Sequence, residues 1–350
     1  MSSGQPGQRL ALAGPVLIDL DGVEIGAAER DMLRHPAVGG VVLFGRNHES
    51  KEQLAVLCRA IHAIDSRLLV TVDQEGGRVQ RFVDGFVTLP PMAVLGAWYD
   101  ENVQAGLALA FDHGLVMAAE LRGCGVDGSW APVLDLQGGN AAIIGHRALH
   151  HDPAAVAALG RAHVAGMRAG GLGAAIKHFP GHGGVEGDSH HMLPHDGRPL
   201  DALWRQDLLP FRVLIEEGMA EAVMMAHVVY ESVDEWPASL SSHWISTILR
   251  QRMGFAGVVV ADDLTMAGAA CGGSWLERAV LARNAGCDLL PVLNDRRAQE
   301  GILDGWPAAA LPVCGSWWRG EAPQASIWQP AAQRLMTQAA TYSQASGAAS

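Results

Sequence analysis

Short apolar runs rich in β-branched residues recur along the chain, and each is separated from the next by a longer segment of helical character. The runs predict eight strands, at residues 15–20, 40–44, 68–73, 129–135, 174–178, 222–227, 257–262 and 288–294. The segments between them predict helices at residues 25–35, 51–64, 103–122, 153–169, 203–217, 243–253 and 274–285. Strands that are apolar almost throughout are typical of a parallel sheet covered on both faces. Eight such units favour an α/β fold of one closed (β/α)8 TIM-type barrel, with a doubly wound open sheet as the alternative.

Polar residues stand at or just beyond the ends of most of these predicted strands. They are Asp73, Asp135, Lys177 with His178, His227, Asp262 and Asn294. A single polar residue at a strand end is usually a helix cap or a solvated turn. In a barrel, however, the carboxyl ends of all strands meet on one face, where the active site is built. We therefore expect these side chains to gather there.

The two ends of the chain differ in character from the repeating part. We expect residues 1–13 to be an N-terminal extension and residues 14–342 to form the barrel, with a C-terminal helical segment near residues 331–340. Residues 343–350 have the composition of a flexible tail. No second domain, internal repeat or long linker is predicted.

Composition narrows the classes of function. The 350 residues are 49% apolar and 18% charged, which is enough for a sizeable core, and the formal net charge is −12. That charge disfavours nucleic acid or an anionic membrane as a partner. Five scattered cysteines without a Cys-x-x-Cys pair predict free thiols in a reducing compartment. With no signal-like N-terminus and no apolar run of about 18 residues, we expect a monomeric cytoplasmic protein without a membrane partner.

Residues 177–190 concentrate more chemistry than any other segment. They hold a Lys, three His, a Glu and an Asp, and Pro180 with its neighbouring glycines excludes a helix. An apolar strand thus delivers ionisable groups into a loop on a rigid scaffold, where catalytic residues often lie. A polar surface loop is the alternative interpretation.

Asp73 ends a predicted strand, and Arg81 follows eight residues later. Gly76 and Gly77 lie between them, but the spacing is not that of a phosphate-binding loop. A carboxylate and a guanidinium in this order suit a ligand rich in hydroxyl groups. An ion-paired turn would use the same residues.

Asp262 and Asp263 follow the seventh predicted strand. Because strand side chains alternate between faces, we expect only Asp262 to face the barrel mouth. A carboxylate in that place can attack an anomeric carbon, whereas Asp263 is expected to cap a helix or hold a neighbour.

Arg147 follows a glycine turn beyond the fourth predicted strand. By itself it is only a weak signal of a functional site.

The histidines predict no metal site. His178 and His182 are four residues apart, but Pro180 and the glycines exclude the helix that would aim both rings at one ion. His150, His151 and Asp152 precede a predicted helix and are more typical of an N-terminal cap. We expect neither a metal nor a cofactor.

Taken together, residues 72–82, 177–190 and 258–266 resemble glycoside hydrolase family three. The most specific string is Lys-His-Phe-Pro-Gly-His-Gly followed by Asp-Ser-His. Val-Asp-Gln-Glu-Gly-Gly-Arg-Val-Gln-Arg and Ala-Pro-Val-Leu-Asp precede it in family order. Within the family, the chain is most similar to the single-domain bacterial β-N-acetylglucosaminidases of peptidoglycan recycling, from residue 14 to residue 294.

The resemblance implies a retaining exo-hydrolase that releases terminal β-1,4-linked N-acetylglucosamine from muropeptide fragments. Asp262 matches the family's nucleophile, His190 its acid/base, and Asp188 the residue that orients His190. An imidazole suits this role because it titrates near neutral pH without burial. The sugar-binding positions of the family match Asp73, Arg81, Arg147, Lys177 and His178.

Two positions depart from the family's pattern. Relatives often carry an acidic residue where this chain has His146, which leaves open what supports Arg147. Met225 is bulkier than the residue expected there, and we expect it to reshape the pocket slightly.

Other functions remain open on the sequence. A β-glucosidase or a broader β-hexosaminidase would use the same fold and carboxylates. A Schiff-base aldolase also needs a Lys near the end of a barrel strand, as Lys177 is. A non-catalytic sugar-binding barrel would make Asp262 and His190 dispensable.

Overall fold

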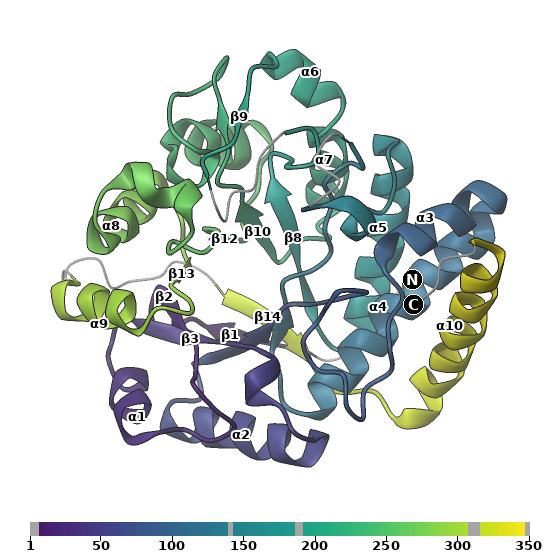
Figure 1. Cartoon of the computed structure of the whole chain (residues 1–350), viewed down its shortest axis with the longest axis horizontal. Helices are drawn as coiled ribbons and strands as arrows, with labels where there is room; N and C mark the ends of the chain where they lie inside the picture. The colour runs from purple at the N-terminus through teal and green to yellow at the C-terminus, as the bar shows by residue number, and fades with distance from the viewer. Residues whose placement is uncertain (1–6, 139–142, 186–191, 307–315, 347–350) are drawn as a thin grey trace.

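The computed structural model describes residues 7–138, 143–185, 192–306 and 316–346. Its centre is a closed ring of eight parallel strands with helices around it (Figure 1). The strands are β2 (Val16–Ile18), β3 (Val38–Leu43), β4 (Leu69–Val72), β7 (Gly128–Ser129), β8 (Gly173–Phe179), β10 (Ala222–Met225), β12 (Val258–Val260) and β13 (Leu290–Pro291). From β2 to β12, each of these strands pairs with the next one in this order, and β13 pairs with β2. A parallel bridge between Val260 and Leu289 joins β12 to the segment that precedes β13 and closes the ring. The predicted barrel is confirmed, and the open sheet is wrong.

Helices surround this ring. They are α1 (Ala27–Leu33), α2 (Lys51–Ile64), α3 (Met92–Glu101), α4 (Val103–Gly123), α5 (Pro153–Ala169), α6 (Leu200–Arg205), α7 (Leu208–Glu216), a π-helical segment (His243–Arg252), α8 (Trp275–Ala285), α9 (Arg296–Gly305) and α10 (Ala325–Ser346). Short 3₁₀ turns lie at Gly45–Asn47, Gly145–Arg147, Ala238–Leu240 and Ala267–Gly272. Within the described ranges, no helix is long and apolar enough to cross a membrane.

The helices differ from the sequence prediction in number, length and continuity. The helix expected over residues 203–217 is divided into α6 and α7, because the backbone at Gln206 leaves helical geometry (φ −116°, ψ −87°). Helices α3 and α9 were not predicted, although Pro91 precedes α3 and the Asp295 side chain caps α9 by accepting from the Ala298 N–H at 3.0 Å. Helix α10 is longer than expected and continues to Ser346.

Strand β7 is much shorter than the predicted run over residues 129–135. Pro132 has no N–H to donate, so the regular ladder is interrupted there, although the Ala131 and Pro132 carbonyl oxygens still accept from the N–H groups of Ala175 at 3.0 Å and Lys177 at 3.2 Å. Pairing resumes at Val133, which bridges to Lys177 on β8. The chain therefore still reaches the carboxyl end of the barrel beside β8, and Asp135 is delivered there.

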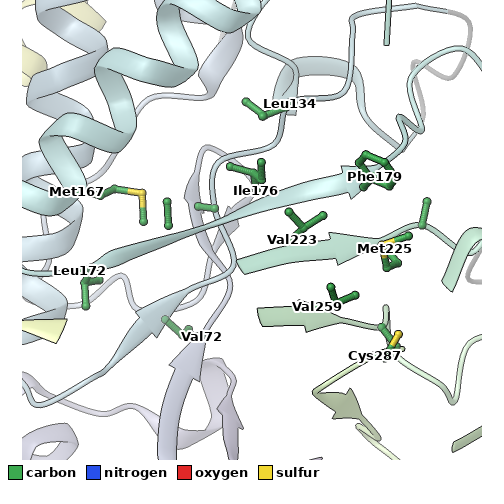
Figure 2. Close-up of a cluster of buried hydrophobic side chains, with 14 of the residues drawn as sticks. Val72, Leu134, Met167, Leu172, Ile176, Phe179, Val223, Met225, Val259 and Cys287 are labelled. Atoms are coloured by element: carbon green, nitrogen blue, oxygen red, sulfur yellow. The ribbon is translucent and has the colours of Figure 1, made fainter. Parts of the chain in front are cut away.

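Alternating side chains divide the core into two layers. Val223 and Met225 point outward from β10 and pack with Ile176 and Phe179 of β8 beneath the helices (Figure 2). Met224 points inward and packs inside the barrel. Met225 therefore does not line the pocket, and the expectation that it reshapes the pocket is wrong; Met224 lines it instead.

A small antiparallel sheet closes the barrel at the amino ends of its strands. It consists of β1 (Gly7–Ala11) and β14 (Ser316–Gly320). Trp317 of β14 is fully buried inside the barrel, where its ring meets Trp130 edge-on with centroids 5.7 Å apart. Its indole N–H donates to the backbone carbonyl of Asp127 at 2.9 Å. β1 and β14, which lie far apart in sequence, thus form the floor of the barrel at the amino ends of its strands.

Candidate active site

The carboxyl ends of the barrel strands surround a cavity of about 260 Å³. Its polar lining includes the predicted residues Asp73, Arg81, Arg147, Lys177, His178 and Asp262. Apolar walls come from Val42, Phe44, Trp130, Met224, Met266 and Leu293. Of the predicted catalytic residues, Asp188 and His190 lie outside the described residues. Convergent polar groups between apolar walls are typical of a small-molecule site.

Lys177 lies at the centre of an ion-pair network in this cavity. Its Nζ is 2.7 Å from Asp73 Oδ1 and 2.6 Å from Glu75 Oε1. Glu75 also accepts two hydrogen bonds from Arg147, from Nε at 2.8 Å and from Nη2 at 2.7 Å. Asp73 is therefore paired with Lys177, and the ion-paired turn between Asp73 and Arg81 is not what the structure shows.

Burial and charge fix the protonation of this network. Complete burial would raise the pKa of Glu75, but the charges of Arg147 and Lys177 outweigh it and hold that pKa far below its ordinary value. Burial would lower the pKa of Lys177, but Asp73 and Glu75 outweigh it and raise the pKa. Lys177 is therefore held as an ammonium ion, whereas a Schiff-base lysine needs a free amine. The aldolase interpretation has no support from this geometry.

His178 is oriented by a carboxylate behind it. Its Nδ1 lies 2.6 Å from Asp135 Oδ2, so Nδ1–H donates and Nε2 is the nitrogen left for other partners. Asp135 is fully buried and also accepts from the backbone N–H groups of His178 at 3.2 Å and His182 at 2.7 Å. One buried carboxylate thus fixes both the strand end and the beginning of the loop after it.

Asp262 and Asp263 both line the cavity, whereas we expect only Asp262 to do so from the sequence, and their carboxylates have different hydrogen-bond partners. Asp262 Oδ1 accepts the Asp263 N–H at 2.9 Å. Although its enclosed position raises the pKa of Asp262, the His227 and His178 imidazoles, the Asp263 N–H and Lys177 together hold that pKa below its ordinary value. Asp262 is therefore ionised.

Asp263 holds the backbone together behind Asp262. Its Oδ1 accepts from the N–H groups of Thr265 at 3.0 Å and Leu293 at 3.1 Å, and its Oδ2 accepts from the Thr265 hydroxyl at 2.9 Å. Its enclosure raises the pKa of Asp263 to about 7. His227 adds a further contact, because its Nε2 lies 2.9 Å from the Asp263 carbonyl oxygen.

Arg147 and Arg81 are held in different ways. His146 is exposed, and the support for Arg147 that the sequence left open comes from Glu75. Arg81 makes no such pair within the described ranges, and its buried Nε–H has no hydrogen-bond partner there. A guanidinium with unused donors beside a cavity suits ligand oxygens.

Three residues that support the site were not predicted from the sequence to belong to it. Asp135 and His227 were recognised only as strand ends, and Glu75 was given no role. Glu75 stands two residues beyond Asp73 on the short strand β5 (Gln74–Gly76), which pairs with β6 (Val79–Gln80). That spacing, which returns a strand side chain to the same face, was the available signal.

The polar residues before α5 have structural roles. Asp152, not an imidazole, caps α5 by accepting the Ala154 N–H at 2.8 Å, as the cap interpretation predicted. His150 Nε2 lies 3.1 Å from Asp100 Oδ1. Among the residues that the structure describes, no group of three or more His, Cys, Asp or Glu is placed to hold a metal ion.

Comparison with known proteins agrees with the sequence resemblance. Residues 15–308 match the glycosyl hydrolase family 3 N-terminal domain. A β-hexosaminidase of Thiobacillus denitrificans is 50% identical over 302 residues, which cover 85% of this chain and 84% of the relative. A β-hexosaminidase of Chromobacterium violaceum is 50% identical over 291 residues, which cover 83% of this chain and 81% of the relative. The crystal structure of NagZ from Neisseria gonorrhoeae in complex with N-trifluoroacetyl-D-glucosamine is similar with a TM-score of 0.84 and 41% identity, covering 95% of this chain and all of that one. The chain belongs to glycosyl hydrolase family 3 and is a glycoside hydrolase.

Proposed function

We propose that this protein is a retaining exo-β-N-acetylglucosaminidase, a β-hexosaminidase that removes a terminal β-1,4-linked N-acetylglucosamine. The observation that carries the proposal is the ionised Asp262 carboxylate in a cavity lined by groups that bind hydroxyl and amide oxygens. The names of the curated relatives and the sugar derivative in the Neisseria structure support the same substrate class.

In this proposal Asp262 attacks the anomeric carbon while the bond to the leaving oxygen breaks. The glycosyl–enzyme ester that forms is then hydrolysed by water with net retention. Asp73, Arg81, Arg147, Lys177 and His178 hold the sugar rather than transfer protons. Their charged donors and the Asp73 carboxylate suit hydroxyl and acetamido oxygens.

His190, oriented by Asp188, is proposed to protonate the leaving oxygen and later to deprotonate the attacking water. The proposal for this pair rests on the sequence match, because both residues lie outside the described ranges. The pair would work as the His and Asp of a hydrolase triad do, with the carboxylate orienting the ring and stabilising the imidazolium.

The natural substrate is proposed to be the N-acetylglucosaminyl-1,6-anhydro-N-acetylmuramyl peptides of cytoplasmic peptidoglycan recycling. A sample of such muropeptides should lose one N-acetylhexosamine by mass spectrometry. If aryl N-acetylglucosaminides are cleaved and muropeptides are not, the enzyme is a broader β-hexosaminidase. Preference for the matching glucoside would instead indicate a β-glucosidase.

Asp262 is predicted to carry the covalent intermediate. A slow fluorinated N-acetylglucosaminide should label one peptide, and tandem mass spectrometry should place the sugar on Asp262. Asp262→Asn should abolish both labelling and hydrolysis, since an amide is a poor nucleophile. A label on Asp263, or inversion at the anomeric carbon, would contradict the assignment.

His190 is predicted to matter most for substrates with poor leaving groups. His190→Ala should slow them by about 10²–10⁴-fold, the range of general acid catalysis, and should slow activated aryl glycosides far less. The neighbouring His191→Ala is the matched control and should leave both rates nearly unchanged. Equal losses for both substrates, when glycosylation is rate-limiting, would make His190 a positioning residue.

A further inference from the structure

We infer that Phe44 is a positioning residue for Arg81, and that Arg46 anchors the Phe44 ring. This inference rests on the proposed function, because Arg81 is one of the groups proposed to hold the sugar. It adds a second mode of support to the site: one cation of the cavity is held by a carboxylate, and another by an aromatic face.

Phe44 stands just beyond β3 and lines the cavity. Two guanidinium groups lie against its ring: Cζ of Arg46 is 4.5 Å from the ring centroid, and Cζ of Arg81 is 5.8 Å from it. Both distances fall within the range of attraction between a cation and an aromatic ring. The side chain of Arg81 thus has a physical restraint that uses none of its hydrogen-bond donors.

This restraint contrasts with that of Arg147. Arg147 gives Nε–H and one Nη–H to Glu75, which neutralises its charge and occupies part of its donor fork. Arg81 is fixed at its backbone, where Gln74 Oε1 accepts its N–H at 2.9 Å. Since its Nε–H has no partner within the described residues, the guanidinium keeps its donors and its charge for a ligand.

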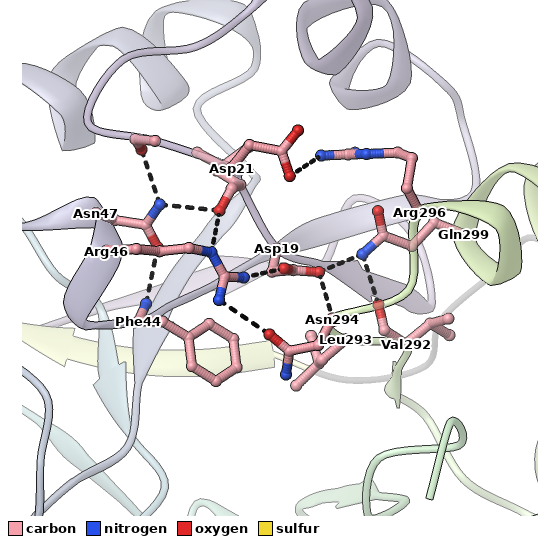
Figure 3. Close-up of polar contacts among 12 residues, drawn as sticks. Asp19, Asp21, Phe44, Arg46, Asn47, Val292, Leu293, Asn294, Arg296 and Gln299 are labelled. Carbon is pink, nitrogen blue, oxygen red and sulfur yellow. Dashed lines mark hydrogen bonds and ion pairs between the residues drawn. The ribbon is translucent and has the colours of Figure 1, made fainter.

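Arg46 is itself rigidly held (Figure 3). Its Nε donates to the Leu20 carbonyl oxygen at 2.8 Å, its Nη1 donates to Asn294 Oδ1 at 2.9 Å, and its Nη2 pairs with Asp19. Asp19 is only 4% exposed. The Asp19 carboxylate balances the charge of Arg46, so that Arg46 restrains the Phe44 ring with little repulsion of Arg81.

The same cluster fixes a second part of the cavity wall. Asn294 lines the cavity with a left-handed backbone (φ 58°), a conformation that asparagine adopts more readily than most residues other than glycine. Its backbone N–H donates to Asp19 Oδ1 at 3.0 Å. Asp19 and Arg46 therefore connect the loops after β2, β3 and β13 into one rim.

A double-mutant cycle tests whether Phe44 acts through Arg81. The variants are Phe44→Leu, Arg81→Ala and the double variant, assayed for kcat/KM on an activated aryl N-acetylglucosaminide and for inhibition by N-acetylglucosamine. Phe44→Leu should lower kcat/KM by about five- to tenfold in the wild-type background and by less than about twofold in the Arg81→Ala background. The same factor in both backgrounds would overturn the inference.

Further variants separate the aromatic face from simple packing. Phe44→Tyr keeps the face and should keep kcat/KM near the wild-type value. Arg46→Met should lower kcat/KM in both backgrounds, because it also releases Asn294, but by a larger factor in the wild-type background than in the Arg81→Ala background. Phe86→Leu is the matched control, because the Phe86 ring lies under the Lys51 ammonium at 4.7 Å but does not line the cavity. A loss of activity in Phe86→Leu equal to that in Phe44→Leu would also overturn the inference.

The outcomes distinguish this inference from the proposed function. A wild-type protein that hydrolyses no β-N-acetylglucosaminide would refute the proposed function before any variant is compared. An active wild type with additive effects of Phe44→Leu and Arg81→Ala would refute the positioning role alone. If Phe44→Leu does not fold, the cycle of Phe44→Met with Arg81→Ala gives the same decision, because Met also lacks the aromatic face.

Discussion

Glu75 pairs with two cations of the cavity. It is 2% exposed, it pairs with Arg147, and it shares Lys177 with Asp73. Buried ion pairs are costly to break, because the remaining partner keeps its desolvation penalty. The carboxylate therefore positions two proposed sugar-binding groups without being proposed to touch the sugar.

Glu75→Gln is expected to damage both stability and activity. Removing one partner of a buried ion pair costs about 3–5 kcal/mol in the free energy of unfolding, and kcat/KM should fall by at least about tenfold. Urea unfolding and steady-state kinetics measure the two effects. The exposed Glu300→Gln is the control and should change neither. Wild-type kinetics in a folded Glu75→Gln protein would remove Glu75 from the supporting network.

For individual residues, the sequence predicted well which side chains reach the cavity, but it predicted poorly which partners they have there. Asp73, Lys177 and Asp262 could be placed because each ends an apolar strand, and barrel strands converge. The pairing of Lys177 with Glu75 joins residues about a hundred positions apart, and no local pattern encodes it. Met225 was misplaced because one step along a strand reverses the face.

Helices α4 and α5 meet through a pair of buried histidines. A Cβ on Gly114 would lie 2.1 Å from the His163 carbonyl oxygen, so only glycine permits this approach. His113 Nε2 lies 3.1 Å from the Pro90 carbonyl oxygen and must donate to it, which leaves Nδ1 to accept from His163 Nε2 at 3.1 Å. Both rings are fully buried and neutral in this arrangement.

This pair predicts a loss of stability in mild acid. Burial lowers the pKa of His113 from 6.5 to about 4, so the unfolded chain binds the proton more readily between these values. The stabilisation is complete above pH 6.5 and is lost as the pH falls toward 4, by about 3 kcal/mol for His113. Denaturant unfolding at pH 7 and pH 4.5 should show a smaller difference for His113→Gln than for the wild type.

The exposed His243→Gln is the control for this experiment and should keep the wild-type pH dependence. An unchanged pH dependence in His113→Gln would mean that other groups cause the loss of stability in acid.

The histidine pair also shows what a prediction of helices from the sequence leaves out. The sequence predicted both helices as segments of helical character between strands, but it gave no sign that an imidazole from each would meet between them.

At the scale of the whole molecule, the floor made by β1 and β14 supports the cavity from below. Trp317 contacts Trp130, and Trp130 lines the cavity. Arg319 of the same strand pairs with the buried Asp127 at 2.6 Å, as does Arg122 of α4 at 3.1 Å. The sequence showed that the C-terminal segment differs from the repeating units, but nothing in its composition predicted that it would enter the barrel.

Trp317→Ala is expected to lower the free energy of unfolding by about 3–5 kcal/mol, because it leaves a cavity in a fully buried place. It should also lower kcat/KM, since Trp130 loses its support. Trp318→Ala, next to it on β14 but only partly buried, should cost less and leave kcat/KM nearly unchanged. Equal effects of the two variants, measured by urea unfolding and kinetics, would contradict a special role for Trp317.

The pairing of β2 with β13 and of β1 with β14 has a consequence for synthesis on the ribosome. Both pairings join residues from the beginning of the chain to residues made some 270–310 positions later. The entropy of closing so long a loop opposes folding only moderately, because it grows logarithmically with loop length. Exposure is the greater difficulty for folding: until β13 has left the ribosome, β2 presents an unpaired strand edge, which is a template for association with other chains. Nascent copies of this protein should therefore depend on chaperones that shield strand edges until the last quarter of the chain has been made.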